Sequence, residues 1–278
     1  MKAGILQLTS SDDPAANLAM TVAMLREAVA QGAGFVLTPE NTNFVSPDRA
    51  LRERVMQSED DDICLAGLRA AAAEAGIWLL IGSLGLRTGD ADGRHANRSF
   101  LIAPDGGIVA RYDKIHMFDV QVSEAETYRE SAAFRPGDRA VTAETPWGVV
   151  GLTVCYDVRF PHLHRMLAKA GARILTAPAA FSTVTGAAHW EVLLRARAIE
   201  TGCYVLAPAQ TGTHPSSTGG PVRRTHGHSL VVAPWGEVLL DAGTEPGVHV
   251  VDLDLAEVER ARGRVPALSH DRPIRPGP

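Results

Sequence analysis

The sequence predicts an α/β fold in which helices cover mixed β-sheets. Three observations support this prediction. Apolar runs typical of buried strands alternate with amphipathic segments typical of helices along most of the chain. Turn signals at 104–107 and 234–236 interrupt this alternation and indicate antiparallel hairpins. The 278 residues are 45% hydrophobic, which is enough for one large domain, and no low-complexity linker or internal repeat divides them.

The first part of the chain begins with a strand and a long helix. The helix has Asp12 or Asp13 as its N-cap and stops at Gly32, and Gly76 stops the second helix in the same way. For this part we expect strands over 3–8, 35–37, 77–83, 98–103 and 108–111, and helices over 13–31 and 62–75.

The second part of the chain continues the alternation. We expect strands over 147–154, 174–177, 203–207, 227–233, 238–240 and 248–253, and helices that begin at Pro161 and that cover 189–201 and 255–262. A loop precedes residue 189, and 212–224 is the most polar and flexible stretch inside the domain. Residues 265–278 contain four prolines and are expected to form an extended tail of a single domain, 1–278.

Composition excludes several functional classes. A net charge of −5 and a pI near 6.1 give no basic footprint for nucleic acid. No run approaches 18 consecutive apolar residues, so no membrane span is expected. The first eight residues do not resemble a signal peptide, and three distant cysteines do not make a disulfide framework. We therefore expect a cytoplasmic protein.

Cys155 is the strongest candidate for a functional residue. It follows the apolar run 147–154 and precedes Pro161, so it lies at a strand-to-helix turn. We expect the thiol to be exposed on one side and close to the positive end of a helix, which favours the nucleophilic thiolate. Cys64 and Cys203 lie in a predicted helix and strand and are interpreted as inert core residues.

Two further strand ends carry groups that a thiol nucleophile needs. Glu40 ends the apolar segment 34–40, where burial would raise the pKa of its carboxyl group and suit it to act as a base. Lys114 directly follows the strand 108–111, and its ammonium would favour a thiolate and bind an oxyanion. Either residue taken alone is more often an ordinary surface residue.

These three segments together resemble the nitrilase superfamily of carbon–nitrogen hydrolases. The resemblance is carried by 37–41, 112–118 and 154–161 and extends over about residues 2–272. It implies a Glu-Lys-Cys triad of Glu40, Lys114 and Cys155. It also implies a four-layer α-β-β-α sandwich, assembly as a homodimer or a higher homo-oligomer, and no metal or organic cofactor.

The resemblance also implies a mechanism. Glu40 takes the proton of Cys155, the thiolate attacks an amide carbonyl, and Lys114 with the backbone N–H of Tyr156 holds the oxyanion. Glu40 then protonates the leaving amine and activates the water that hydrolyses the thioester.

A second glutamate follows the lysine in many members of this superfamily. Glu130 matches its place here and is expected to orient the substrate or the lysine rather than to accept the first proton. Glu124 and Glu126 lie nearby and offer alternative registers for the same role.

Within the superfamily the chain is most similar to the Nit-type amidases, which cleave amide bonds of 2-oxo acids. The similarity rests on 155–161, 185–197 and 196–204 and implies an anionic substrate, with deaminated glutathione preferred. Arg159 would bind the substrate carboxylate and Thr185 would add a hydrogen bond. Alternatives are ω-amidase action on 2-oxoglutaramate or 2-oxosuccinamate, and hydrolysis of N-carbamoyl amino acids. Transfer of the acyl group to an amine instead of water stays open.

The segment 211–224 is longer than expected for this branch. With His214, Arg223 and Arg224 it would line the longer, more polar pocket that an amino-acid leaving group requires.

Three rival functions have weaker support. The segment 227–231 approaches a serine nucleophile elbow around Ser229, but Val231 replaces its last glycine. The pairs His162/His164 and His226/His228 lack the carboxylates of a hydrolytic metal site. A non-catalytic binding scaffold is disfavoured because all three triad residues are present.

Overall fold

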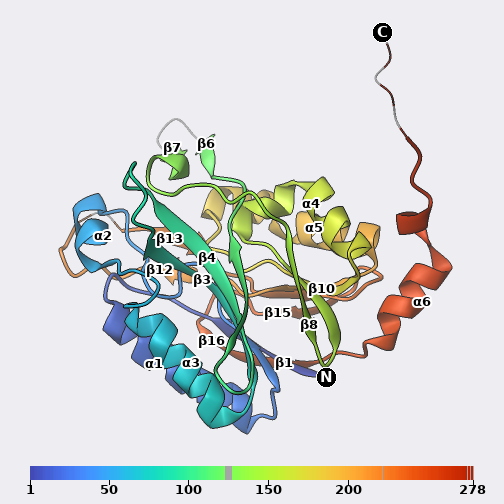
Figure 1. Cartoon of the computed structure of the whole chain (residues 1–278), viewed down its shortest axis with the longest axis horizontal. Coiled ribbons are helices and arrows are strands. Elements are labelled where there is room, and N and C mark those ends of the chain that lie inside the picture. The colour runs from blue at the N-terminus through green and yellow to red at the C-terminus, as the bar shows by residue number, and fades with distance from the viewer. Residues whose placement is uncertain (123–126, 221, 274, 276, 278) are drawn as a thin grey trace.

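Two six-stranded mixed sheets form the centre of the protein (Figure 1). The structure is a computed structural model that describes residues 1–122, 127–220, 222–273, 275 and 277. The first sheet has the order β16 (Gly247–Asp252), β1 (Lys2–Gln7), β2 (Phe35–Leu37), β3 (Trp78–Arg87), β4 (His95–Ile102) and β5 (Ile108–Asp113). The second has the order β15 (Val238–Asp241), β14 (Leu230–Val232), β11 (Tyr204–Ala207), β10 (Ala172–Thr176), β9 (Gly148–Leu152) and β8 (Val141–Thr145).

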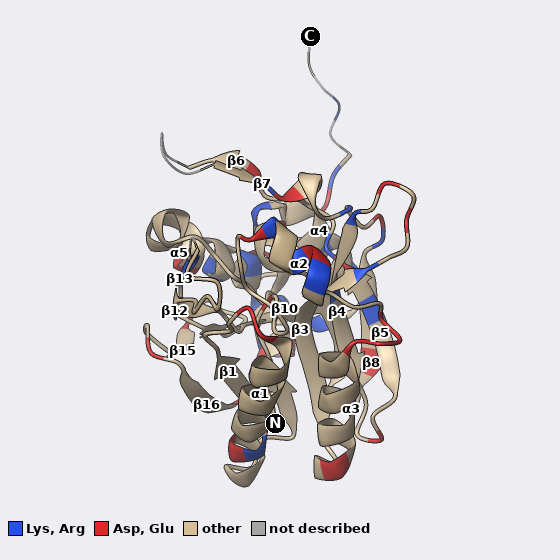
Figure 2. Cartoon of the chain, turned by 90° about the vertical axis from the view of Figure 1, so that its left-hand side faces the viewer, with Lys and Arg blue, Asp and Glu red and all other residues tan. Residues whose placement is uncertain are grey.

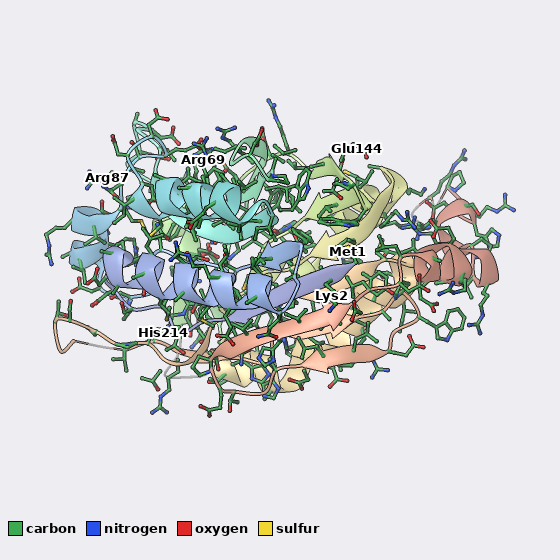
Figure 3. All side chains as sticks on the ribbon, turned by 90° about the horizontal axis from the view of Figure 1, so that it is seen from below. Met1, Lys2, Arg69, Arg87, Glu144 and His214 are labelled. Carbon is green, nitrogen blue, oxygen red and sulfur yellow. The ribbon has the colours of Figure 1, made fainter. Side chains whose placement is uncertain are left out.

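Helices cover the outer face of each sheet. In Figure 1, α1 (Pro14–Ala30) and α3 (Ile63–Ala75) lie on one side of the strands, and α4 (Pro161–Lys169) and α5 (Thr183–Thr201) lie on the other. Figure 3 shows α1 and α3 side by side on the outer face of the first sheet. The four layers therefore run helix, sheet, sheet, helix, and the predicted α-β-β-α sandwich is confirmed.

Alternation of side chains along the strands fills the spaces between these layers. In β1, Ile5 belongs to the apolar cluster that joins the two sheets, whereas its neighbour Leu6 belongs to the cluster under α1 and α3. In β2, Leu37 likewise belongs to the cluster between the two sheets, and Val36 belongs to the cluster under α1 and α3. Successive residues of a strand point to opposite faces, so a strand buried on both faces has a continuous apolar sequence.

The central strands are parallel where the candidate site is built. β1, β2 and β3 pair in parallel in the first sheet, and β9, β10 and β11 do so in the second. The two predicted hairpins, β4–β5 and β14–β15, are antiparallel as expected. The carboxyl ends of the parallel strands gather at one edge of the two sheets, which is where such folds place their ligands.

Gly82 permits a close approach at this edge. A Cβ atom at position 82 would lie 2.1 Å from the carbonyl oxygen of Thr38 and 2.6 Å from the Cβ of Pro178. β3 also changes its register with β4 between Ile81 and Leu84. The segments that follow β2 and β10 can therefore meet only because position 82 has no side chain.

The structure corrects several expected boundaries. α5 begins at Thr183, six residues before the predicted start, because the side chain of Ser182 caps it by accepting from the N–H of Thr185. The stretch 212–224 was expected to be loop, but its two ends belong to a short hairpin of β12 (Thr211–Thr213) and β13 (Arg224–His226). The sequence analysis also did not predict α2 (Arg49–Val55), β8, or the hairpin of β6 (Asp119–Gln121) and β7 (Thr127–Arg129).

The C-terminal segment is less extended at its start than predicted. After α6 (Ala256–Arg264), a short 3₁₀ turn, η3, covers Ala267–Ser269. Asp271 then forms ion pairs with Arg165 and Lys169 of α4. Figure 1 shows the chain leaving the layers beyond this contact. Across the described residues, no helix has the length and apolar character needed to cross a membrane.

Candidate active site

A cavity of about 600 Å³ opens at the carboxyl ends of the central strands. Glu40, Lys114 and Cys155 all line it, although they are separated by as many as 115 positions in the sequence. Four other parts of the chain also line the cavity. They are the segment 46–52, which includes the start of α2, the strand β7, the start of α5, and the residues at and just before the start of β13. The structure therefore brings the three predicted triad residues into one cavity.

Glu40 lies three residues beyond β2 and its side chain is 2% exposed. One carboxylate oxygen accepts hydrogen bonds from Lys114 Nζ and Asn97 Nδ2, each at 2.9 Å. The other accepts from the backbone N–H of Ala180 at 2.8 Å. The carboxylate also interacts with the Cys155 thiol, whose pKa its negative charge raises. The acid is held by hydrogen-bond partners from three different segments of the chain.

Lys114 directly follows β5 and connects the two glutamates of the site. Its Nζ lies 2.9 Å from Glu40, and 2.9 and 2.8 Å from the two carboxylate oxygens of Glu130. Glu130 begins the short 3₁₀ turn η1 (Glu130–Ala132) and accepts another hydrogen bond from the N–H of Phe118 at 2.7 Å. Glu130 therefore contacts the lysine, as the sequence analysis expected. The alternatives Glu124 and Glu126 lie outside the described residues.

Cys155 begins the 3₁₀ turn η2 (Cys155–Arg159), between β9 and α4. Its backbone is left-handed, with φ of 51°, which is unfavourable for a residue with a side chain. The turn is held because Cys155 N–H donates to the carbonyl of Pro178 at 2.8 Å, and Val154 N–H donates to the buried Asp157 carboxylate at 2.9 Å. This conformation places the thiol in the cavity.

The protonation states differ from those expected from the sequence. Burial raises the pKa of the Cys155 thiol, the negative charge of Glu40 raises it further, and Lys114 opposes the shift only in part. Cys155 is only 7% exposed, so the expected exposed thiolate was wrong. The resting cysteine is therefore a neutral thiol.

Glu40 was also expected to have a raised pKa. Burial does push the pKa of Glu40 upward, but the charges of Lys114 and Arg223 outweigh it and lower the value to about 2. Burial likewise opposes the charge on Lys114, yet Glu130 and Glu40 together raise the pKa of its ammonium. At neutral pH the site therefore holds a carboxylate, an ammonium and a neutral thiol.

The structure places the three residues assigned to oxyanion or substrate binding differently with respect to the cavity. Tyr156 and Thr185 line the cavity, and Tyr156 is in the first turn of η2, where an N–H has no acceptor within the helix. Arg159 does not line the cavity itself. Its guanidinium carbon lies 5.7 and 5.4 Å from the ring centres of Tyr156 and Phe181, both of which do.

The extra segment before β13 contributes cations to the cavity. Arg223 and Arg224 line it, as expected. His214 does not, because its ring is buried against the carbonyl of Ser10 and the hydroxyl of Thr225, and burial lowers its pKa to about 4. The expected role of His214 as a lining residue was therefore wrong.

The sequence analysis missed two residues that organise the site. Asn97 donates to both Glu40 and Glu130, at 2.9 and 3.2 Å. In the sequence, Asn97 is recognisable only as a polar residue next to an apolar run. The strand was predicted to begin at residue 98, one position after Asn97, whereas β4 begins at His95. Asp157 accepts from four donors around Cys155, two of them on His116. The sequence analysis used Asp157 only as one residue of the segment 154–161 and assigned it no role.

The residues of the rival functions lie elsewhere. Ser229 is buried, and its hydroxyl accepts from the N–H of Ala209 at 2.8 Å, outside the lining of the cavity. His226 and His228 stack on each other, with ring centres 4.6 Å apart. In the part of the chain that the structure describes, no group of three or more His, Cys, Asp or Glu residues is arranged to hold a metal ion.

Comparison with known proteins agrees with this geometry. The carbon–nitrogen hydrolase family matches residues 2–263. A deaminated glutathione amidase of Synechocystis is 39% identical over 273 residues, which cover 96% of this chain and 97% of that protein. The crystal structure of the Caenorhabditis elegans NitFhit protein superposes with a TM-score of 0.87 and 34% identity. That match covers 98% of this chain and 65% of the longer NitFhit chain.

A third relative bears on the chemistry. A mutant amidase from Nesterenkonia sp. AN1, 28% identical with a TM-score of 0.79, carries the acetamide moiety of fluoroacetamide on its active-site cysteine. That match covers 98% of this chain and 94% of the amidase.

The chain belongs to the carbon–nitrogen hydrolase family, and its fold is that of the nitrilase superfamily. It is a hydrolase of carbon–nitrogen bonds other than peptide bonds. Among its relatives are proteins named deaminated glutathione amidase from bacteria and mammals, at 38–40% identity, which confirms the resemblance to the Nit-type amidases.

Proposed function

We propose that this protein is a thiol-dependent amidase that cleaves the amide bond of deaminated glutathione through a thioester on Cys155. The observation that carries the proposal is the cavity in which Cys155, Glu40 and Lys114 meet, each held by hydrogen bonds. The choice of substrate is supported by the names of the curated relatives.

The first half of the reaction forms the thioester. Glu40 accepts the proton of Cys155, and the sulfur attacks the amide carbon as the proton leaves. Negative charge develops on the carbonyl oxygen, where Lys114 and the N–H of Tyr156 stabilise it. Glu40 returns the proton to the nitrogen as the carbon–nitrogen bond breaks, and the amine departs.

The second half restores the enzyme. A water molecule gives a proton to Glu40 and attacks the thioester carbon. Lys114 and the N–H of Tyr156 again stabilise the oxyanion that forms. The carbon–sulfur bond breaks, and Glu40 reprotonates the departing sulfur. In this scheme Glu130 keeps Lys114 in place and takes no proton, because it accepts from that ammonium through both oxygens.

We propose that Arg159 and Thr185 recognise the acyl part of an anionic substrate. Arg159 is packed against two rings that line the cavity and is half-buried, so its charge reaches the Tyr156 side of Cys155. Thr185 lines the cavity, and its hydroxyl is 2.9 Å from that of Ser182. A 2-oxo acid would present its carboxylate there.

A panel of amides tests the proposal. Wild type and Cys155→Ala are compared on deaminated glutathione, 2-oxoglutaramate, an N-carbamoyl amino acid and a simple nitrile. We expect the highest kcat/KM on deaminated glutathione, and no turnover by the variant. A preference of more than about tenfold for the nitrile or the N-carbamoyl compound, about 1.4 kcal/mol in barrier, would contradict it.

We further propose that the protein acts in the cytoplasm as a homodimer or a higher homo-oligomer. The three cysteines are unpaired, which suits a reducing compartment. Val192 and Ile199 on the outer face of α5 are 68% and 56% exposed, which is large for aliphatic side chains and fits a contact between subunits. Light scattering would test the assembly, and a monomer at micromolar concentration would contradict it.

A further inference from the structure

The cavity holds more positive charge than the triad uses. Its lining contains five cationic side chains, on Arg52, Lys114, Arg129, Arg223 and Arg224, and two carboxylates, on Glu40 and Glu130. Both carboxylates contact the ammonium of Lys114. The charge of the remaining arginines is therefore available to an anion, and a volume of about 600 Å³ exceeds what a primary amide of a small acid fills.

Arg52 is a cation fixed in the wall without an acid. It lies on α2, is half-buried, and its guanidinium carbon is 5.8 Å from the ring centre of Phe134. The adjacent Glu53 instead lies 3.4 Å from His95. Within the described residues, Arg52 forms no ion pair. Figure 2 shows α2 at the end of the molecule where the β6–β7 hairpin lies.

Arg223, in the segment before β13, also lines this cavity. One Nη donates to the carbonyl of Ala180 at 2.7 Å, while Nε is buried and has no hydrogen-bond partner. Arg223 also has no ion pair in the described part of the chain. Burial lowers the pKa of Arg52, and although Glu53 opposes this, the charge of Arg223 lowers it further. The two guanidinium groups thus repel each other within the cavity that both of them line.

Arg52 lies apart from Arg159. In Figures 1 and 2, α2 is separated from α5, which packs with η2 around Arg159. Glu40 and Cys155 also line the cavity. A substrate with a carboxylate at each end, one in the acyl part and one in the amine part, matches two separate cationic positions.

We propose that Arg52 and Arg223 form a second carboxylate site, which binds the carboxylate of the departing amine. The preferred substrates would then release an amino acid or a short peptide rather than ammonia. This inference rests on the proposed function, because it assumes that the acyl part is bound on the Arg159 side and attacked by Cys155.

Arg52 gives the clearer test of the two arginines, because Arg223 also lowers the pKa of Glu40. The substrates are deaminated glutathione and the same compound with its terminal carboxylate converted to a carboxamide. In wild type, we expect this change to lower kcat/KM by about 10- to 100-fold, as for loss of a charge-assisted hydrogen bond. In Arg52→Gln the penalty should shrink to less than about threefold.

Arg54→Gln is the matched control. It removes the same charge from the same helix, but Arg54 is exposed and does not line the cavity, so the full penalty should remain. Equal kcat/KM for the two substrates in wild type would overturn the proposal, as would an equal penalty in wild type and Arg52→Gln.

A binding measurement separates this site from the catalytic proposal. The dipeptide Cys-Gly and its carboxamide are titrated calorimetrically into Cys155→Ala and into Cys155→Ala with Arg52→Gln. We expect the free carboxylate to bind the first protein at least tenfold more tightly, and this preference to vanish in the second. Absent or indiscriminate binding by the first protein would overturn the site even if hydrolysis is confirmed. Discriminating binding without hydrolysis would overturn the proposed function alone.

Discussion

Glu40 and Glu130 share the ammonium of Lys114, but they bind it differently. Glu130 uses both carboxylate oxygens, at 2.9 and 2.8 Å, whereas Glu40 uses one, at 2.9 Å. The second oxygen of Glu40 accepts from the N–H of Ala180. This asymmetry suggests a division of labour, in which Glu130 fixes the lysine and Glu40 exchanges protons with Cys155.

The first prediction concerns these two acids. Glu130→Gln should lower kcat by about 100-fold with little change in KM, because Lys114 loses one of its two charged partners and is displaced. Glu40→Gln should lower kcat by up to about 10⁴-fold, because the base itself is lost. Steady-state kinetics on the best amide of the panel measures both effects.

Glu144→Gln is the control for this pair. Glu144 is exposed on β8, and Figure 3 shows it on the surface of the molecule. Its activity should match wild type. If Glu130→Gln is the more damaging of the two site variants, then the roles of the acids are reversed.

The second prediction concerns stability at low pH. The pKa of Glu40 falls from an ordinary 4.5 to about 2 in the folded protein, because Lys114 and Arg223 outweigh burial. Between these values the unfolded chain binds more protons at this group, so its contribution to stability is present above about pH 4.5 and is lost as the pH falls towards 2. The free energy of unfolding should therefore depend more steeply on pH in wild type than in Glu40→Gln.

Urea unfolding of the two proteins between pH 3 and 6 measures this difference. In the lower part of this range, the unfolding free energy of wild type should change with pH more steeply than that of Glu40→Gln, by about 1.4 kcal/mol per pH unit. This difference corresponds to the uptake of about one proton on unfolding. It should vanish near pH 6. Identical pH profiles would show that Glu40 has an ordinary pKa in the folded state.

The third prediction concerns the turn that carries the cysteine. Asp157 is fully buried and accepts from Tyr112 Oη, from the N–H and ring of His116, and from Val154 N–H, at 2.7–3.1 Å. Asp157→Asn replaces an acceptor by a donor within this network and should cost about 3 kcal/mol of stability. It should also lower kcat, because the strained backbone of Cys155 loses its support.

Asp241→Asn is the matched control for Asp157→Asn. Asp241 also contacts a histidine ring, that of His228 at 2.8 Å, but this pair is partly exposed to solvent, unlike the buried Asp157. Its loss should change stability by less than about 1 kcal/mol. Thermal unfolding of the two variants measures the difference. An unchanged Tm for Asp157→Asn would refute the proposal that Asp157 supports the turn that carries Cys155.

The fourth prediction separates the cysteine from the serine alternative. Ser229→Ala should retain kcat/KM within about twofold, because the hydroxyl is outside the cavity. It should lose about 1–3 kcal/mol of stability, because the buried N–H of Ala209 loses its acceptor. Inactivation of a still-folded Ser229→Ala protein would restore the serine hypothesis.

Much of the fold was predictable because its signals are local. The continuous apolar runs of β1, β2, β9 and β10 indicate strands buried on both faces, and the turn signals gave the two hairpins. The first turn of α5 was missed because Thr, Val and Gly are poor helix formers, and the cap at Ser182 outweighs their propensity.

The members of the site were predictable, but their charge states were not. Glu40, Lys114 and Cys155 each follow a strand, and strand ends meet at one edge of a sheet, but the joint resemblance of their three segments to the nitrilase superfamily was needed to single them out. Their pKa shifts depend on distances across the fold, such as that from Glu40 to Arg223, which lies 183 positions away. No local pattern specifies such a distance, so the expected thiolate and the expected raised pKa of Glu40 were both wrong.

The most direct test of the central claim is to trap the acyl group on the enzyme. Wild type is mixed rapidly with deaminated glutathione, quenched in acid during the first turnovers and analysed by peptide mass spectrometry, with Cys155→Ala as the control. We predict that the peptide containing Cys155 gains the mass of the 2-oxo acyl group, and that the control peptide gains none. Continued turnover by Cys155→Ala, or an acyl group attached at another residue, would contradict the account.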